Sequence, residues 1–493
     1  MWSLGCRVIG CAAGASIVVP LLLGAQELGP DVRQYVRVDA PVVALTHVRV
    51  VDGTLSPARD NQTIVISGGK IASVGGAEVA IPSGAQVLDL PGYTVIPGLV
   101  GMHDHMFYTS SLDRDSTGRT PAPGQLAGQE GYSFPRLYLA AGVTTIRTTG
   151  SMEPYMDLNL KMQIDDGRAP GPRMYISAPY LEGKGTPFPQ MHELTGPDDA
   201  RKFVDYWADA GATSFKGYTH LTRAELGAAI TEAHRRGTTV TAHLCSVGYY
   251  DAIALGIDDF EHGPVGTDAD YVPGKKPDVC PAPPAIFASW VDVPVPGPAV
   301  DSLIRTLVAH HVAITSTLPV YELSIPDRPP LQRRMLDAMS TESRVSYLTM
   351  RARGGAKWHG QPLPWGALMA KEMAFELEFV RAGGLLLTGP DPTGIGGVLA
   401  GFGDQRGVEL LVEGGFTPIE AIHIATANGS QFLGASTIFG TIANGKQADL
   451  VVIKGDPSSR ISDIENVEIV FKGGIGYDSD KLIQSVRGVV GIR

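Results

Sequence analysis

The pattern of apolar residues divides the chain into two β-rich ends and an alternating middle. Residues 42–51 and 63–67 are β-branched runs separated by turn residues, which is typical of antiparallel strands. A similar pattern returns near the carboxyl terminus, for example at residues 448–453. We therefore predict one small β-sandwich-like domain built from both termini, residues 42–96 plus 436–480.

Residues 97–435 alternate β-branched runs with stretches of helical spacing. Residues 223–236 have such spacing, and Thr417 to Glu420 form a capping box with proline at the first helical position. Eight strands are predicted to end near His105, Thr148, Ser177, Lys216, His243, His262, Leu318 and Asp391. Eight βα units of this length predict an α/β fold, a (β/α)8 TIM barrel over residues 97–435.

The segment 264–298 interrupts the alternation. It is rich in proline and follows the sixth predicted strand. We expect a long ordered loop there, at the catalytic face of the barrel, where it would shape access of the substrate.

The first 25 residues resemble a targeting segment. They contain a basic residue, then a long apolar run that ends in small residues before the chain turns polar. We predict a signal peptide over residues 1–25, cleaved near Ala25, and export to the periplasm or the medium. An uncleaved anchor and a lipoprotein at Cys11 are the alternatives. Cleavage would leave no stable membrane span.

Composition narrows the class of protein. The 493 residues are 44% hydrophobic and 18% charged, as in an ordinary globular enzyme, and the formal net charge is −11. No basic cluster exists to neutralise phosphates, so we expect a small-molecule substrate and no nucleic acid. After cleavage only Cys245 and Cys280 would remain, and the sequence does not decide whether they pair.

The polar residues at the predicted strand ends suggest a metal site. His103 and His105 are separated by one residue, so on a strand both imidazoles point the same way and can bind one ion. Taken singly, such residues have ordinary explanations: a hydrogen-bonded histidine, a solvent-directed lysine, an aspartate in a turn. Six together, at the end where barrel enzymes keep their active sites, favour one shared site. The six are His103, His105, Lys216, His243, His262 and Asp391.

The segments that carry these residues resemble the amidohydrolase superfamily. They are residues 97–105, Lys216, His243, 261–263 and Asp391, with the closing segments 409–418, 425–429 and 440–452. The resemblance covers residues 42–475 and favours the branch of imidazolonepropionase-like proteins, Xaa-Pro dipeptidases and ochratoxin-hydrolysing amidases. One departure is Pro390, which is inserted into the usual Gly-Thr-Asp ending of the last strand.

This resemblance implies a centre of two divalent metal ions. His103 and His105 would hold the first ion and His243 and His262 the second, with Zn²⁺ the expected metal because imidazole suits it. Lys216 lies on an apolar strand, where desolvation should depress the pKa of its amine. The resemblance implies that this amine is carboxylated and that the carbamate bridges the two ions.

The remaining site residues follow from the same comparison. Asp391 would complete the first metal site and act as general base beside a bridging hydroxide, then as general acid to the leaving amine. Tyr218 and His220 share the strand parity of the predicted bridging lysine, so either could contact substrate; the alternative is a pair of loop residues with local hydrogen bonds. Arg147 and Arg406 are candidates for binding a substrate carboxylate.

We therefore predict a metal-dependent amidohydrolase that cleaves an amide-type C–N bond of a dipeptide or an N-acyl amino acid. A lactonase or esterase using the same centre is an alternative, because an activated water attacks esters as well. A non-catalytic binding relative is disfavoured by its six retained ligands. Since members of the superfamily are often homo-oligomers, a homo-oligomer is compatible with the resemblance.

Overall fold

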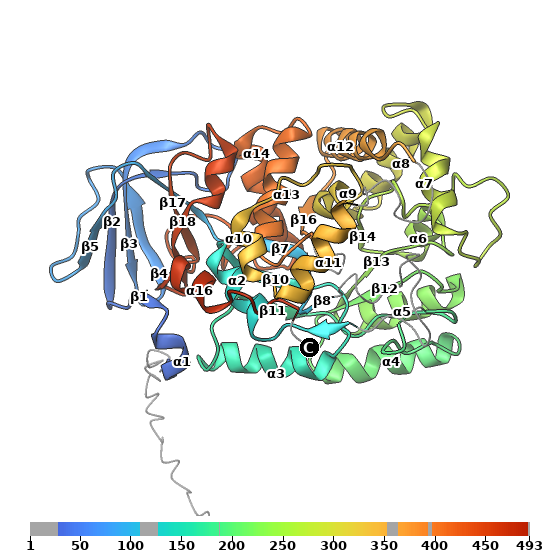
Figure 1. The fold of residues 1–493 in the computed structure, drawn as a ribbon, viewed down its shortest axis with the longest axis horizontal. Helices are drawn as coiled ribbons and strands as arrows, with labels where there is room; N and C mark the ends of the chain where they lie inside the picture. The colour runs from blue at the N-terminus through green and yellow to red at the C-terminus, as the bar shows by residue number, and fades with distance from the viewer. Residues whose placement is uncertain (1–27, 109–126, 187, 353–362, 393–396, 492–493) are drawn as a thin grey trace, which may run out of the picture.

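The computed structural model shows a β-sheet at one end of the molecule and alternating strands and helices in the rest (Figure 1). The structure describes residues 28–108, 127–186, 188–352, 363–392 and 397–491. The predicted signal peptide, residues 1–25, lies outside the described residues. Among the helices that are described, none is long and apolar enough to cross a membrane.

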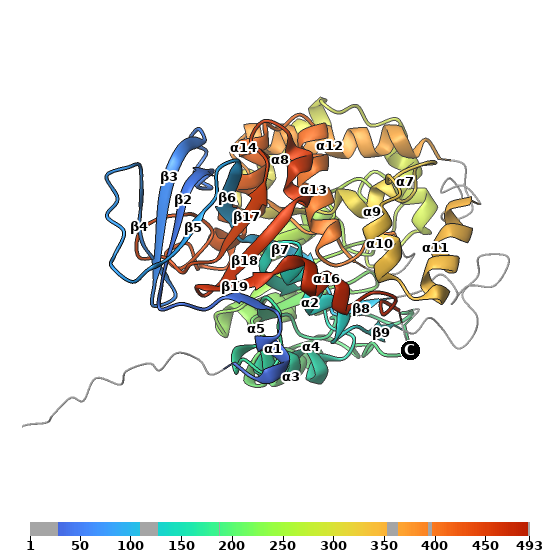
Figure 2. The same ribbon diagram turned by 60° about the vertical axis from the view of Figure 1, so that its left-hand side comes forward.

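Strands from the two ends of the chain share one nine-stranded sheet, which Figure 2 shows from its side. Its order is β1-β19-β18-β17-β6-β2-β3-β4, with β5 paired to β2. The strands are β1 (Val36–Val38), β2 (Val42–Val50), β3 (Arg59–Ser67), β4 (Lys70–Gly75), β5 (Gln86–Asp89), β6 (Tyr93–Pro97), β17 (Leu450–Lys454), β18 (Val467–Lys472) and β19 (Ile475–Asp478). The sheet thus begins before residue 42, and its separation as a domain stays a prediction.

The side chains of β17 alternate between two apolar cores, one on each face of this sheet. Leu450 and Val452 join an apolar core formed by the sheet strands themselves, whereas Val451 and Ile453 join the main core of the protein. The period of two along a strand sends successive residues to opposite faces. β17 pairs antiparallel with β6, which leads directly into the first strand of the middle region.

All eight strands predicted for the middle region are present. They are β7 (Leu99–Asp104), β10 (Val143–Thr148), β11 (Arg173–Ile176), β12 (Ser214–Gly217), β13 (Thr239–Ala242), β14 (Asp259–Glu261), β15 (Ala313–Ser316) and β16 (Leu386–Thr388). β7, β10 and β11 form one parallel sheet, and β12 to β16 form another. A parallel bridge between Ser177 and Ser214 joins the end of β11 to β12. At the other edge the Asp391 amide donates to the His103 carbonyl at 3.0 Å.

Helices separate these strands and cover them. They are α1 (Pro30–Arg33), α2 (Ser133–Ala140), α3 (Pro154–Asp165), α4 (Pro197–Asp209), α5 (Arg223–Arg235), α6 (Tyr249–Leu255), α7 (Pro283–Val291), α8 (Pro298–Ala309), α9 (Leu318–Glu322), α10 (Arg333–Ala338), α11 (Thr341–Ala352), α12 (Trp365–Arg381), α13 (Phe402–Glu413), α14 (Pro418–His423), α15 (Gly429–Phe432) and α16 (Ser479–Ser485). The short strands β8 (Phe107–Tyr108) and β9 (Gly128–Gln129), a π-helical turn (Ile424–Asn428) and a 3-10 helix (Ile461–Glu465) complete the elements. The predicted capping box of α14 is confirmed, because Thr417 and Glu420 bond each other's backbone amides.

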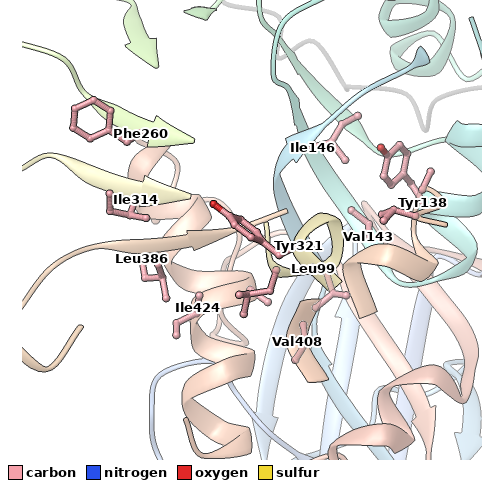
Figure 3. Close-up of a cluster of buried hydrophobic side chains, with 14 of the residues drawn as sticks. Leu99, Tyr138, Val143, Ile146, Phe260, Ile314, Tyr321, Leu386, Val408 and Ile424 are labelled. Carbon is pink, nitrogen blue, oxygen red and sulfur yellow. The ribbon is translucent and has the colours of Figure 1, made fainter. Parts of the chain in front are cut away.

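The main core lies between the central strands and their helices. Figure 3 shows Leu99, Ile146, Phe260, Ile314 and Leu386 from the strands against Val408 and Ile424 from the helical layer. Each of these side chains is buried. Removing them from water is the main stabilising term for such a layer.

The proline-rich segment 264–298 is not wholly a loop, and the prediction was wrong there. It contains the helix α7, whose first turn holds Pro283 and Pro284. Proline is tolerated in a first turn because the amides it lacks have no partner within the helix. Trp290 of α7 is fully buried, so the segment packs as part of the fold. Cys280, in the same segment, forms a disulfide with Cys245.

Candidate metal centre

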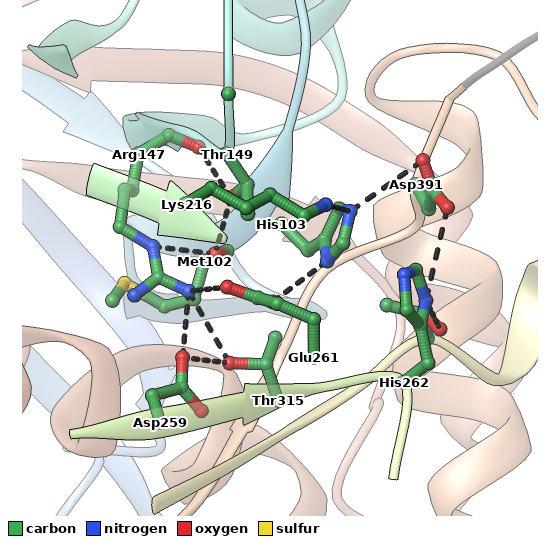
Figure 4. A network of polar contacts seen from close by, with 12 residues as sticks. Met102, His103, Arg147, Thr149, Lys216, Asp259, Glu261, His262, Thr315 and Asp391 are labelled. Atoms are coloured by element: carbon green, nitrogen blue, oxygen red, sulfur yellow. Dashed lines mark hydrogen bonds and ion pairs between the residues drawn. The ribbon is translucent and has the colours of Figure 1, made fainter. Parts of the chain in front are cut away.

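The ends of the central strands bring the six predicted ligands to one place. His103 is the last residue but one of β7, Lys216 lies on β12, and His243 and His262 directly follow β13 and β14. The ring centroids are 4.5 Å apart for His103 and His262 and 4.6 Å apart for His243 and His262. Figure 4 shows Lys216, His103, His262 and Asp391 directed toward one another. Residues from position 103 to 391 therefore meet at the carboxyl ends of the parallel strands.

Three of them form a ligand set that fits a metal ion. One ligand atom each from His103, His105 and Asp391 lies within 4.8 Å of the others. Asp391 Oδ1 is 3.2 Å from His105 Nε2 and 3.5 Å from His103 Nε2. Asp391 Oδ1 is buried and has no hydrogen-bond partner among the described residues. A buried carboxylate oxygen without a partner, aimed at two imidazole nitrogens, is the chemistry that a divalent cation satisfies.

Burial sets the charge of the histidines. It lowers the pKa of His105 to about 4 and that of His243 to about 3. Burial also lowers the pKa of His103, and that of His262 falls well below its usual value. At neutral pH all four rings are therefore neutral, which is the form that binds metal.

A second layer of hydrogen bonds orients three of these rings. His103 Nδ1 is 2.7 Å from Glu261 Oε2, His105 Nδ1 is 3.2 Å from the Gly150 carbonyl, and His262 Nδ1 is 2.8 Å from Thr317 Oγ1. In His103 and His105 the Nδ1 nitrogen carries the ring proton and donates it to these acceptors. The Nε2 nitrogen therefore keeps the lone pair that can bind a metal ion. In both rings this is the nitrogen that faces Asp391.

Arg147 supports this layer and is not a ligand for substrate. Its guanidinium is 1% exposed and donates to Glu261 Oε1 at 2.9 Å and to Asp259 Oδ2 at 2.8 Å. Figure 4 shows the chain of contacts from Arg147 through Glu261 to His103. Arg406 is likewise engaged, by Glu322 and Glu409. Both candidate arginines are therefore paired with carboxylates of the protein itself.

Lys216 is fully enclosed beside the ligand set. Its Nζ lies 3.1 Å from His103 Nε2 and 5.3 Å from the ring centroid of Tyr180. Burial lowers the pKa of the Lys216 ammonium, which favours the free amine that carboxylation requires. Its carboxylation and bridging role stay predictions.

The inserted proline does not displace Asp391 from the site. The Asp391 amide donates to the His103 carbonyl, and Asp391 has a left-handed φ of 51°. Gly389 makes this close approach possible, because a Cβ there would lie 2.2 Å from the His103 amide nitrogen. Asp391 therefore reaches the histidines through the edge contact between β16 and β7.

The two predicted substrate contacts differ in position. The Tyr218 ring is 5.3 Å from that of His243 and 5.0 Å from that of Tyr180, so it lies beside the ligand set. His220 instead contacts Glu182, with Nδ1 3.5 Å from Glu182 Oε2. The Glu182 hydrogen bond raises the pKa of His220. In the described part of the chain, His220 hydrogen-bonds to Thr219 and Glu182 and not to the ligand set.

Several residues of the site were missed by sequence reasoning. Tyr180 contacts Lys216 and Tyr218 from the loop after β11, and nothing in its local sequence marks it. The sequence motif at residues 261–263 includes Glu261 but predicts no role for it. The sequence does carry a signal for it: Asp259 and Glu261 are two positions apart on a buried strand, so their side chains lie on the same face. Two buried carboxylates on one face need a buried positive charge, which Arg147 supplies.

Comparisons with known proteins agree with this geometry. The model of the amidohydrolase family matches residues 94–295 and 400–475. A search of curated proteins finds no match. Among solved structures, a candidate prolidase from Bifidobacterium longum is 24% identical with a TM-score of 0.62, over 90% of this chain and 98% of the other. A Xaa-Pro dipeptidase with bound methionine is 19% identical with a TM-score of 0.64, over 89% and 100%. The ochratoxinase of A. niger is 20% identical with a TM-score of 0.61, over 90% and 96%.

At these identities the likeness shows the fold alone, which is of the TIM-barrel type. The family match covers more than half of the chain and includes five of the six predicted ligands, all except Asp391. The predicted branch is confirmed too, since the similar structures include prolidase-like amidohydrolases. This chain therefore belongs to the amidohydrolase family, a family of hydrolases that typically bind metal.

Proposed function

We propose that this protein is an exported hydrolase that cleaves an amide-type C–N bond of a dipeptide or an N-acyl amino acid, using two divalent ions. The observation that carries the proposal is Asp391 Oδ1, buried without a hydrogen-bond partner among the described residues and facing His103 and His105. The site would lie at the carboxyl ends of a closed (β/α)8 barrel over residues 97–435.

The donor set assigns each residue a place. His103, His105 and Asp391 would hold one ion, and His243 with His262 would hold the other, most simply as Zn²⁺. A carboxylated Lys216 would bridge them, since its amine is buried beside His103. When bound, the ions supply an activated water and polarise the scissile carbonyl.

The protein's own groups would then move the protons and hold the substrate. Asp391 would take a proton from the attacking water and deliver it to the leaving nitrogen. The Tyr218 ring lies next to His243, in a position to contact the substrate. His220, whose pKa is raised by Glu182, is retained only as a more distant contact.

The similar structures support this substrate class. One is a Xaa-Pro dipeptidase with methionine bound in its active site, and another is a candidate prolidase. The Cys245–Cys280 disulfide supports export, because disulfides persist mainly in oxidising compartments.

The test is the metal content of the purified mature protein, with and without Lys216→Ala, followed by a substrate panel. We expect about two divalent ions per chain, fewer in Lys216→Ala, and a carbamate signal when the protein is reconstituted with isotope-labelled bicarbonate. Lys202→Ala, at an exposed position of α4, is the control and should keep both ions. One ion or none in the wild type, unaffected by Lys216→Ala, contradicts the two-ion centre. Cleavage of esters or lactones but of no amide in the panel contradicts the substrate class.

A further inference from the structure

The four histidines of the centre are not held in the same way. His103, His105 and His262 each have a hydrogen-bond partner at Nδ1. Among the residues that the structure describes, the His243 ring has none. Its ring packs against those of His262 and Tyr218, at 4.6 and 5.3 Å between centroids. Since ligand histidines are normally oriented by such a bond, another feature must hold His243.

The backbone that directly follows His243 is fixed by a disulfide and a hydrogen bond. Two residues after His243, Cys245 forms a disulfide with Cys280, and their Cα atoms are 4.8 Å apart. Lys275 Nζ donates to the Ser246 carbonyl at 2.8 Å. Both contacts tie the stretch just after His243 to the segment 264–298. On its other side, the His243 amide donates to the Gly217 carbonyl at 3.0 Å.

The segment 264–298 is itself held in place by burial and hydrogen bonds. Trp290 of α7 is fully buried, and its Nε1 donates to the Asp268 carbonyl at 3.2 Å. Asp278 accepts from the Arg223 amide at 2.9 Å, which fixes the segment to the start of α5. Cys245 itself is 2% exposed and packs in a small apolar cluster with residues of this segment. A disulfide to such an anchored segment restricts the backbone of its partner.

We propose that the Cys245–Cys280 disulfide positions His243 for metal binding, in place of the ring hydrogen bond that the other three histidines have. This rests on the proposed ligand role of His243. The cysteines touch neither metal nor substrate, so they are positioning residues. Losing such support typically weakens metal affinity by about 10–100-fold, and here only at the ion held by His243 and His262.

The test is Co²⁺ binding to the mature protein and to the double variant Cys245→Ser with Cys280→Ser. We expect the wild type to bind in two steps, one of which weakens by about tenfold or more in the variant, with a changed visible spectrum for that ion. The other step should be unchanged. Arg223→Ala is the matched control, because it removes only the guanidinium contacts to Asp278, at 3.1 and 3.3 Å, and keeps both the Arg223 amide bond and the disulfide. Its two steps should equal those of the wild type. Two unchanged steps and an unchanged spectrum in the double variant overturn the proposal.

Hydrogen exchange of the metal-free proteins gives a readout that does not depend on metal. We expect faster exchange at residues 243–250 in the double variant and no change at β7, which carries His103. Equal exchange at 243–250 overturns the positioning role. If the wild type binds no Co²⁺ at all, the proposed function fails, while the exchange result still decides whether the disulfide orders this stretch.

If the double variant does not fold, the same Co²⁺ titration is done on the wild-type protein. Its disulfide is first reduced with a phosphine and then re-formed with oxidised glutathione. Reduction should weaken the same Co²⁺ step, and reoxidation should restore it as the disulfide re-forms by exchange with the glutathione disulfide. Identical Co²⁺ binding by the reduced and oxidised forms, with thiol titration confirming reduction, overturns the proposal.

Discussion

At Glu261 one buried carboxylate serves two partners. One oxygen orients His103, and the other accepts from Arg147. Burial alone would raise the pKa of Glu261, but Arg147, the hydrogen bond to His103 and the nearby Lys216 together outweigh it and lower that pKa to about 2. The carboxylate is therefore ionised throughout the range in which the protein would work, and the His103 ring keeps one tautomer.

Glu261→Gln is expected to weaken metal binding more than it unfolds the protein. The amide can still accept from His103, but it loses the charge that Arg147 pairs with. We expect about 10–100-fold lower metal affinity and a loss of roughly 1–3 kcal/mol in the free energy of unfolding. Chelator competition and urea unfolding measure the two effects. Glu468→Gln, in an exposed pair with Arg37, should cost under about 1 kcal/mol and leave metal affinity alone; equal effects from both variants would contradict the orienting role of Glu261.

At the scale of elements, the contact between β16 and β7 depends on the absence of a side chain. Gly389 follows β16, and a Cβ there would lie 2.2 Å from the backbone nitrogen and 2.7 Å from the Cα of His103. The neighbouring atoms belong to the backbone of His103, a predicted metal ligand, so they cannot move without moving that residue. This position therefore couples strand packing to the metal centre.

Gly389→Ala should destabilise the protein by roughly 1–3 kcal/mol and lower its metal affinity. The matched control is Gly366→Ala in α12, where a Cβ meets nothing within 4 Å. There the same substitution should be neutral or stabilise by about 0.5–1 kcal/mol, because alanine favours helix. Urea unfolding and metal titration of both variants test this, and a Gly389→Ala protein as stable as Gly366→Ala would show that the strands can separate freely.

The helix α12 carries two buried acids that the centre does not use. Glu372 and Glu376 are one helical turn apart and fully buried. Burial raises the pKa of both, that of Glu376 to about 8. The folded protein therefore keeps a proton that the unfolded chain releases near pH 4.5. Stability should fall as pH rises from about 4.5 to 8, by about 1.4 kcal/mol per pH unit for one such proton.

Glu376→Gln should make this slope shallower by the contribution of one proton, because an amide does not titrate, and should leave the contribution of Glu372. We expect the variant to gain stability relative to the wild type as pH rises from 5.5 to 7.5, measured as the free energy of unfolding in urea. Glu378→Gln, at an exposed position on the same helix, should keep the wild-type slope. A Glu376→Gln protein whose stability varies with pH as the wild type does would show that Glu376 is ionised in the folded state.

At the scale of the whole molecule, the six predicted ligands connect distant strands. They lie on or directly after β7, β12, β13 and β14 and shortly after β16, so one place brings together elements nearly 300 positions apart in the chain. Without cations, Asp391 and the histidines present lone pairs to one another in a buried space. The metal-free protein should therefore be the less stable form.

Metal removal tests this. A chelator should lower the melting temperature by several degrees, and added Zn²⁺ should restore it, since a ligand at about 1,000 times its dissociation constant stabilises by about 4 kcal/mol. The melting temperature of His105→Asn, which lacks one predicted ligand, should change less when the chelator or Zn²⁺ is added. Equal melting temperatures with chelator and with Zn²⁺ would contradict a buried metal centre.

The sequence by itself determined the elements of this protein and most of the residues of its centre. Alternating and helical periods are local, so the eight central strands and the capping box of α14 could be predicted from neighbouring residues alone. The ends of those strands marked the six predicted ligands, because parallel strands end at one edge.

Only the tertiary structure decided which side chains meet across that edge. It showed that Asp391 reaches His105 despite Pro390, and that Arg147 is occupied by Asp259 and Glu261. It also paired Cys245 with Cys280 and turned part of the segment 264–298 into α7. These contacts join residues far apart in the chain, and their geometry depends on the packing of the whole set of strands, which no local pattern encodes.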